Sequence, residues 1–201
     1  LRGTKKIHKR LKLFELIDVN DLASLAKIID GNLTGENKRF QYITTDSRRI
    51  NRDTLFLALL GEKYEGNDFC ETAIEAGAQA YISTKEIINK AGIVVEDTYL
   101  ALLKMARYQQ QQVNPKTLAI TGSNGKTTLK EMVAHILDND ESITTKDNEN
   151  NQFGIPFTVL RLKPETRFLV LECGARKLGD FDLISEYLKF DVLAITNINN
   201  S

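Results

Sequence analysis

The chain has 201 residues, and its 27 lysines and arginines balance its 27 aspartates and glutamates, so the formal net charge at pH 7 is zero. This balance excludes a global field that would attract nucleic acid or an anionic membrane, so any phosphate chemistry must be local. The longest apolar runs, such as 55–60 and 168–171, are far shorter than the roughly 20 residues of a membrane span. Cys70 and Cys173 lack metal-ligand spacing, which predicts reduced, buried thiols in a soluble cytoplasmic protein.

The amino-terminal part is expected to form a small α/β domain. Its first residues, LRGTKKIHKRLK, lack the features of a signal peptide and predict a solvated basic arm rather than a nucleic-acid tail. Apolar spacing predicts a helix over 22–29 that stops at Gly31-Asn32, where a residue tolerant of positive φ is expected. A short helical segment is expected between the strands predicted over 80–83 and 92–95. The expected strands are 40–45, 54–60, 80–83 and 92–95, and a further helix is expected over 69–76.

The carboxy-terminal part is expected to form a doubly wound parallel sheet. Asp97 and Thr98 can cap a helix over 99–112, which Asn114 and Pro115 terminate. After it, strands and helices alternate, which is typical of a parallel sheet. The expected strands are 117–120, 142–145, 168–171 and 192–196, and the expected helices are 127–137, 155–162 and 181–188. We therefore expect an α/β fold with two domains, 1–97 and 98–201.

The stretch AITGSNGKTTLKE, residues 119–131, predicts a phosphate-binding loop. Gly125, Lys126 and Thr127 match the end of the pattern G-x-x-x-x-G-K-[ST], although Ile120 stands at its first glycine. A strand followed by a helix points several backbone N–H groups and the positive helix end at one spot. Lys126 could then contact outer phosphates, and the Thr127 hydroxyl could ligate a divalent cation. The alternative is a glycine-rich turn with a solvated lysine.

An acidic residue is expected at the same edge of the sheet as the phosphate-binding loop. The apolar stretch FLVLE ends at Glu172, and Gly174 lets the chain turn away. Ligands gather at the carboxyl ends of parallel strands, so Glu172 should share a rim with the loop and offer an oxygen to Mg²⁺. A strand-ending glutamate in solvent is the alternative. The polar stretches 146–156 and 196–201 extend this rim, and on composition alone the first is an ordinary loop.

Four blocks, in this order and spacing, resemble the ATP-binding central domain of the Mur ligases of peptidoglycan synthesis: TGSNGKTTLKE, NENNQFGIPFTVLRL, LVLECGARKLGDFDLI and VLAITNI. TTDSRRINRDTLFLALLGEKYEGNDF with AIEAGAQAYIS is similar to their amino-terminal uridine-nucleotide-binding domain. Within the family, the context of Ser123 and Lys130-Glu131 resembles the members that add D-alanyl-D-alanine to UDP-N-acetylmuramoyl-tripeptide. The sister ligase that adds the third amino acid is the nearest alternative. Asp147-Asn148 departs from the Gly-Asn usual in the family.

The resemblance implies ATP and Mg²⁺ as cofactors, with an acyl phosphate formed on the tripeptide carboxylate and attacked by the amine of D-alanyl-D-alanine. Lys126 and Glu172 would be catalytic, and Thr127 and Glu172 would bind the metal. The residues implied at the ATP phosphates are Gly122, Ser123, Asn124, Gly125, Lys126, Thr127 and Thr128. Asn150 and Asn151 would lie near the nucleotide and the reacting carboxylate, and Asp46, Ser47 and Arg48 would lie near the UDP-sugar.

The resemblance also implies parts that this sequence does not contain. In the family a magnesium-binding histidine follows the T-N-I-x-x-x stretch, and the chain stops at Ser201. The carbamylated lysine, the rest of the ATPase sheet and the carboxy-terminal domain are not found either. We therefore expect a fragment of a longer monomeric enzyme, which binds ligands without turnover. A non-catalytic nucleotide-binding module and a phosphoryl-transfer kinase are the alternatives from other classes.

Overall fold

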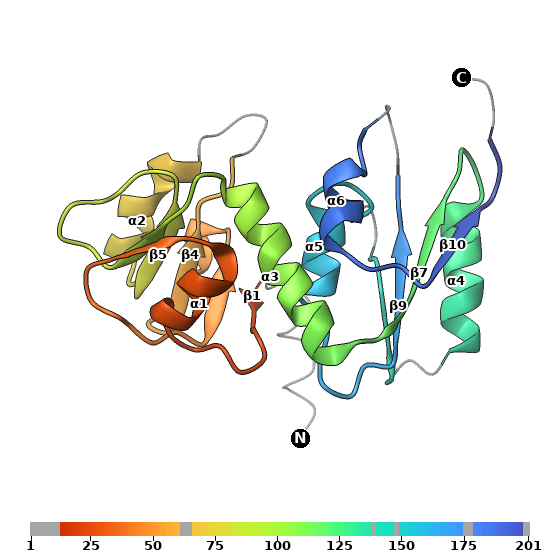
Figure 1. The fold of residues 1–201 in the computed structure, drawn as a ribbon, viewed down its shortest axis with the longest axis horizontal. Coiled ribbons are helices and arrows are strands. Elements are labelled where there is room, and N and C mark those ends of the chain that lie inside the picture. Colours follow the sequence, from red (N-terminus) through yellow and green to blue (C-terminus); the bar gives the residue numbers. More distant parts are fainter. Residues whose placement is uncertain (1–12, 61–65, 138–139, 147–148, 175–178, 199–201) are drawn as a thin grey trace. The chain divides into compact units, whose positions relative to one another are not determined.

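The computed structural model describes residues 13–60, 66–137, 140–146, 149–174 and 179–198. The chain divides into two compact units, Leu1–Leu102 and Leu103–Ser201, whose elements are drawn in Figure 1. The division falls within helix α3 (Thr98–Val113), and the domain boundary expected after residue 97 stays a prediction. The basic arm and the Asp147-Asn148 departure lie outside the described residues.

The first unit is built on a six-stranded sheet of order β1-β3-β4-β5-β6-β2. The four inner strands are parallel, and β1 and β2 are added to the edges as antiparallel strands. Both β4 and β5 are buried along their whole length, which is why their sequences are mostly apolar and do not alternate with charged residues. The strands are β1 (Leu13–Phe14), β2 (Asn32–Thr34), β3 (Tyr42–Thr44), β4 (Thr54–Leu57), β5 (Ala80–Ser83) and β6 (Gly92–Val94).

Two α-helices and two short 3₁₀ turns complete this unit. Helix α1 (Leu22–Ile29) packs on β2 and β6, and α2 (Cys70–Glu75) packs on β5. The turn η3 (Ser47–Arg49) follows β3, and the turn η4 (Gly66–Phe69) directly precedes α2. The helical segment expected between β5 and β6 is wrong, because residues 84–91 form bends and a turn.

Helix α1 begins and ends through its neighbouring aspartates. Asp21 caps the start, since its carboxylate accepts from the Ser24 amide (3.0 Å) and the Ser24 hydroxyl (2.7 Å). The left-handed residue at the other end is Asp30, with φ of 53°, so the positive φ expected at Gly31-Asn32 lies one residue earlier. Gly31 is needed for a different reason, because a Cβ there would overlap the Ile93 side chain on β6.

The second unit is a four-stranded, fully parallel sheet of order β10-β7-β9-β8. The chain crosses from β7 to β8 in one direction and returns through β9 to β10 in the other. Right-handed crossovers therefore place α4 on one face and α5 and α6 on the opposite face, as Figure 1 shows. The predicted doubly wound α/β fold is confirmed. The elements are β7 (Lys116–Thr121), α4 (Lys126–Ile136), β8 (Ser142–Thr144), α5 (Gly154–Val159), β9 (Phe168–Glu172), α6 (Asp182–Tyr187) and β10 (Val192–Ile195).

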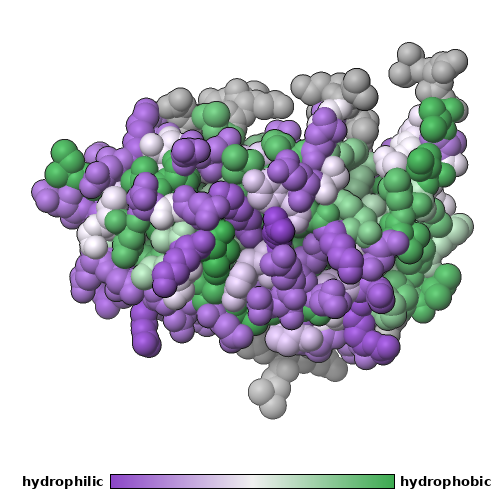
Figure 2. All heavy atoms as spheres, in the orientation of Figure 1, coloured by the Kyte–Doolittle hydropathy of each residue, from purple (hydrophilic) through white to green (hydrophobic). Residues whose placement is uncertain are grey.

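Apolar side chains are exposed at the β10 edge of this sheet and on α4. In Figure 2 they contribute to the hydrophobic surface on the right-hand side of the view. Within the described residues, β10 pairs only with β7, so its outer edge carries no strand. The exposed apolar residues are Met132 and Ile136 on α4, Val192, Leu193 and Ile195 on β10, and Ile198 after it.

The expected state of the cysteines is confirmed. Cys70 and Cys173 are both free and buried. Burial raises the pKa of Cys70 to about 11 and that of Cys173 to about 12, so neither thiol is a ready nucleophile at neutral pH. As for membrane spans, none of the helices in the described ranges is both long and apolar enough to cross a bilayer.

The Asp21 cap gives a pH-dependent prediction. The Ser24 amide and hydroxyl lower the pKa of Asp21, so its charge stabilises the fold fully above its unfolded value, and this contribution is lost as pH falls through the lowered folded value. Asp21→Ala should cost about 1 kcal/mol of unfolding free energy at pH 7. Asp21→Asn keeps a cap acceptor and should cost less. Urea unfolding should show the wild-type advantage over Asp21→Asn shrinking toward pH 3, and an undiminished advantage there would contradict the prediction.

Candidate functional site

The phosphate-loop motif forms the predicted strand, loop and helix. Strand β7 ends at Thr121, and α4 begins at Lys126. Gly122 (φ 132°) and Gly125 (φ 80°) both adopt backbone conformations that favour glycine, and a Cβ on Gly122 would overlap the Thr196 hydroxyl. No side chain caps the first turn of α4. Its N–H groups and positive end are therefore suited to an anion.

The end of β10 holds this loop from the side. The Ser123 amide donates to the Asn197 carbonyl (3.0 Å), and the Asn124 amide donates to Asn197 Oδ1 (2.8 Å). The Thr196 hydroxyl donates to the carbonyls of Thr121 (3.2 Å) and Asn124 (2.5 Å). The polar stretch after β10 thus lies at the rim, as expected, and it supports the loop backbone. These particular bonds were not predictable from the residue pattern.

Lys126 is folded back onto its own loop. Its Nζ donates to the carbonyl of Gly122 (2.6 Å) and lies 3.3 Å from that of Ser123. The ammonium is thus already beside the loop where phosphate oxygens would lie. To contact phosphate it would exchange carbonyl oxygens for anionic ones, which are stronger acceptors.

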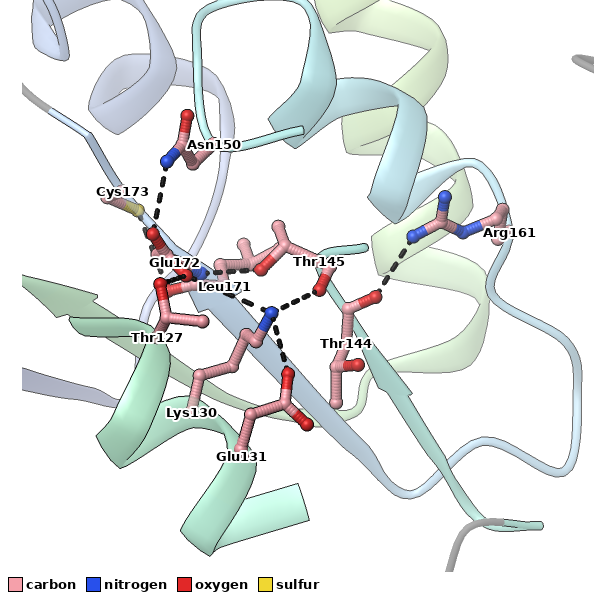
Figure 3. A network of polar contacts seen from close by, with 10 residues as sticks. All are labelled: Thr127, Lys130, Glu131, Thr144, Thr145, Asn150, Arg161, Leu171, Glu172 and Cys173. Carbon is pink, nitrogen blue, oxygen red and sulfur yellow. Dashed lines mark hydrogen bonds and ion pairs between the residues drawn. The ribbon is translucent and has the colours of Figure 1, made fainter. Parts of the chain in front are cut away.

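Glu172 ends β9 beside the phosphate loop, as predicted from the sheet topology. It is buried, at 3% exposed, which excludes the alternative of a strand-ending glutamate in solvent. Its Oε2 accepts from the Thr127 hydroxyl (3.0 Å), and its Oε1 accepts from Asn150 Nδ2 (3.0 Å), as Figure 3 shows. Its amide donates to the Thr145 hydroxyl (2.9 Å). Side chains from α4 and from the loop before α5 thus contact the carboxylate, and the residue after β8 holds the backbone of Glu172.

Lys130 is a member of this site that the sequence did not reveal. It lies on α4 and is as buried as Glu172, at 3% exposed. Its Nζ donates to the Thr145 carbonyl (3.0 Å) and forms ion pairs with Glu131 Oε1 (3.1 Å) and Glu172 Oε2 (3.8 Å). Besides the family-like context of Lys130-Glu131, the available signal was the position of Lys130 three residues after Thr127, which places both on one helix face.

The loop before α5 is fixed by backbone and side-chain contacts. The Gly174 amide donates to the Asn150 carbonyl (2.8 Å), and a side chain at Gly174 would crowd that of Asn150. Asn151 Oδ1 accepts from the amides of Phe153 and Gly154, so its side chain caps α5. The structure thus brings Asn150 to Glu172 and uses Asn151 locally. Their roles toward a nucleotide stay predictions.

These residues fit a magnesium nucleotide. The oxygens of Thr127 and Glu172 are hard ligands, and they lie 3.0 Å apart. Adjacent ligands of an octahedral Mg²⁺ with bonds of roughly 2.0–2.1 Å are separated by about 2.9 Å, so both could hold one ion. No group of three or more His, Cys, Asp or Glu is gathered for a metal in the described part of the chain. Phosphate oxygens and water, which Mg²⁺ usually keeps among its ligands, would occupy further positions around the ion.

In the first unit, Asp46, Ser47 and Arg48 lie together after β3. Asp46 caps η3 and accepts two bonds from the Arg48 guanidinium, at 2.8 and 2.9 Å. These bonds from Arg48 lower the pKa of Asp46. The Arg48 side chain is 86% exposed. The three residues therefore present a charged, accessible turn at the carboxyl end of a parallel strand.

A parallel sheet with a phosphate loop at its carboxyl edge defines a phosphate-loop nucleotide-binding fold. Comparison with known families identifies which family within this broad class the chain matches. Residues 39–119 match the description "Mur ligase family, catalytic domain", and residues 120–201 match "Mur ligase middle domain". The chain belongs to the Mur ligase family.

Curated relatives agree with this assignment. The UDP-N-acetylmuramoyl-tripeptide–D-alanyl-D-alanine ligase of Haemophilus influenzae is 37% identical over 87% of the chain and 40% of that protein. The ligase of the same name from Bacillus subtilis is 35% identical over 91% of the chain and 41% of that protein. The chain thus spans about 40% of the length of these relatives.

Solved structures give the same result. A crystal structure of MurF from Acinetobacter baumannii is 32% identical, with a TM-score of 0.81, over 92% of this chain and 43% of that one. MurF ligase from Thermotoga maritima in complex with ADP is 29% identical, with a TM-score of 0.71, over 77% of this chain and 37% of that one. A ligase named for 2,6-diaminopimelate addition is 20% identical and shares the fold alone.

Arg161 gives a prediction about the loop that carries Asn150. It contacts Glu149 Oε2 (2.5 Å), and its second nitrogen donates to the Thr144 carbonyl (3.0 Å), in a half-buried setting. Arg161→Met should lower the unfolding free energy by about 2 kcal/mol, because charge-assisted bonds are lost from partly buried groups. The matched control is Arg167→Met, whose exposed pair with Glu141 should contribute less than about 1 kcal/mol. Equal losses in urea unfolding would contradict this prediction.

Proposed function

We propose that this chain binds magnesium ATP and the UDP-sugar substrate as part of a ligase that adds D-alanyl-D-alanine to UDP-N-acetylmuramoyl-tripeptide. The observation that carries the proposal is the 3.0 Å contact between Thr127 and Glu172, directly beside the G-K-T loop. The names of the relatives support the reaction, and the ADP complex of the Thermotoga maritima enzyme supports the nucleotide. We assign this activity to the cytoplasm, in a monomeric enzyme.

The chemistry requires no protein nucleophile. The γ-phosphoryl group of ATP is transferred to the tripeptide carboxylate, the amine of D-alanyl-D-alanine attacks the resulting acyl phosphate, and phosphate leaves. The protein has to hold two anions together and cancel their charge. The loop amides and Lys126 would bind the phosphates, and Thr127 and Glu172 would hold Mg²⁺, which supplies further positive charge when bound. Asn150 would orient Glu172 through the bond to its second oxygen.

The first unit would hold the uridine nucleotide. Arg48 is exposed at the carboxyl end of β3, where ligands of parallel sheets gather. Its planar guanidinium already makes a two-bond contact with the carboxylate of Asp46. The same geometry suits a diphosphate or a carboxylate of the substrate. Asp46 and Ser47 would then fix the turn that presents Arg48.

The phosphate loop is tested by ATP binding. Titration calorimetry of the chain with ATP and MgCl₂ should show binding, and Lys126→Ala should weaken it about 10²-fold, because a charged phosphate contact is lost. The control is Lys116→Ala, which changes an exposed lysine at the opposite end of β7. In a full-length enzyme, the Lys126 substitution should lower turnover by about 10²-fold or more. Equal ATP affinity of the Lys126 and Lys116 variants would remove Lys126 from the site.

The UDP-sugar site is tested separately. Calorimetry with UDP-N-acetylmuramoyl-tripeptide should show binding to the wild-type chain, and Arg48→Met should weaken it about tenfold or more, because a bidentate charged contact is lost. Arg52→Met is the matched control, since Arg52 is an exposed arginine of the same connection between β3 and β4. Absence of wild-type binding would contradict the assignment of this unit and favour a nucleotide-binding module that ligates nothing.

A further inference from the structure

Lys130 is the buried cation next to the Glu172 carboxylate. A buried ammonium is unfavourable unless it is paired and hydrogen-bonded, so its position needs a physical reason. It lies on α4 three residues after Thr127, and the two side chains therefore leave the same face of the helix. That face meets the carboxyl ends of β8 and β9, where Thr145 and Glu172 lie (Figure 3).

The distances around Lys130 separate two kinds of contact. Its hydrogen bond goes to the Thr145 carbonyl at 3.0 Å, and Glu131 lies at 3.1 Å. Glu172 Oε2 lies further away, at 3.8 Å, which is an ion-pair distance. The lysine thus supplies charge to Glu172 and leaves the carboxylate oxygens directed at Thr127 and Asn150. A direct hydrogen bond would instead occupy a position that a cation needs.

Thr145 forms a second link between the lysine and Glu172, through the backbone amide of Glu172. Its carbonyl accepts from Lys130, and its hydroxyl accepts from the amide of Glu172 at 2.9 Å. Lys130, Thr145 and Glu172 therefore link α4 to the ends of two neighbouring strands. Loss of these lysine contacts would remove the positive charge beside Glu172. It would also remove a link between the sheet and α4, the helix that carries Thr127.

We propose that Lys130 is a positioning residue of the cation site: it compensates the buried charge of Glu172 and fixes its carboxylate beside the Thr127 hydroxyl. This inference rests on the proposed function, because it assumes that Thr127 and Glu172 bind Mg²⁺ with the nucleotide. Two lysines of α4, four residues apart, then have different tasks. Lys126 contacts the loop and the phosphates, and Lys130 holds the metal ligand from behind.

The experiment measures how much Mg²⁺ strengthens ADP binding. Calorimetry of the wild-type chain with ADP, in MgCl₂ and in EDTA, gives two affinities, whose ratio is the magnesium-dependent gain. Lys130→Met should lower this gain about tenfold or more, as is typical when a residue supporting a metal ligand is lost. Its affinity for ADP in EDTA should stay at the wild-type value. Lys130→Arg keeps the charge and should retain most of the gain, and Lys116→Met should retain all of it.

Each outcome decides between a positioning and a merely structural lysine. An unchanged or larger gain in Lys130→Met overturns the inference, and so does an equal loss of ADP affinity with and without Mg²⁺. Circular dichroism checks the fold, and if the Met variant does not fold, Lys130→Gln replaces it, since Gln remains polar without a charge. A full gain in that variant also overturns the inference. A wild-type chain that binds no ADP overturns the proposed function and this inference together, whereas wild-type binding with an unchanged variant overturns this inference alone.

Discussion

The candidate site depends on one constraint: the carboxylate of Glu172 is buried at the end of an inner strand and must be compensated where it lies. Strand β9 runs between β7 and β8, so its carboxyl end is flanked by the phosphate loop on one side and by Thr145 on the other. The carboxylate receives a hydroxyl from Thr127, a side-chain amide from Asn150 and a positive charge from Lys130. The parallel topology thus brings together residues that are far apart in the sequence.

Strand register makes this arrangement specific. Ile120, the residue before the last of β7, is paired with Glu172, the last residue of β9, so the two strands end within one residue of each other. A slip of β9 by one residue would exchange Glu172 for Leu171 or Cys173 and turn the carboxylate to the opposite face of the sheet. Glycine allows the close approach at the rim, since Gly122 passes the Thr196 hydroxyl and Gly174 passes Asn150. Packing in the sheet and backbone freedom in the loops therefore act together.

The sequence predicted the parts of this site that depend on local pattern. Strand, loop and helix around Lys126, and Glu172 at a shared rim, follow from periodicity, glycine placement and parallel topology. Lys130 could not be found this way, because a lysine in an amphipathic helix is expected in solvent and only tertiary contacts bury it. Strands β1 and β2 are too short to show a period of two. The short helical segment expected between β5 and β6 does not form, because the Ile87 amide bonds to the buried Tyr81 hydroxyl instead of a helical carbonyl.

The charged pairs differ in whether a ligand could displace them. The Arg48 side chain is exposed, although its partner Asp46 is half-buried, so water can solvate the guanidinium while it exchanges Asp46 for a substrate anion at small cost. In the described part of the chain, Lys126 Nζ donates to two loop carbonyls, which phosphate can replace. Lys130 and Glu172 are both buried, and breaking such a pair leaves an uncompensated charge at a cost of several kcal/mol. Exposure thus separates the cations suited to contacting ligands from the one that belongs to the scaffold. The same helix supplies both kinds, because its first turn lies at the open loop and its second turn lies against the sheet.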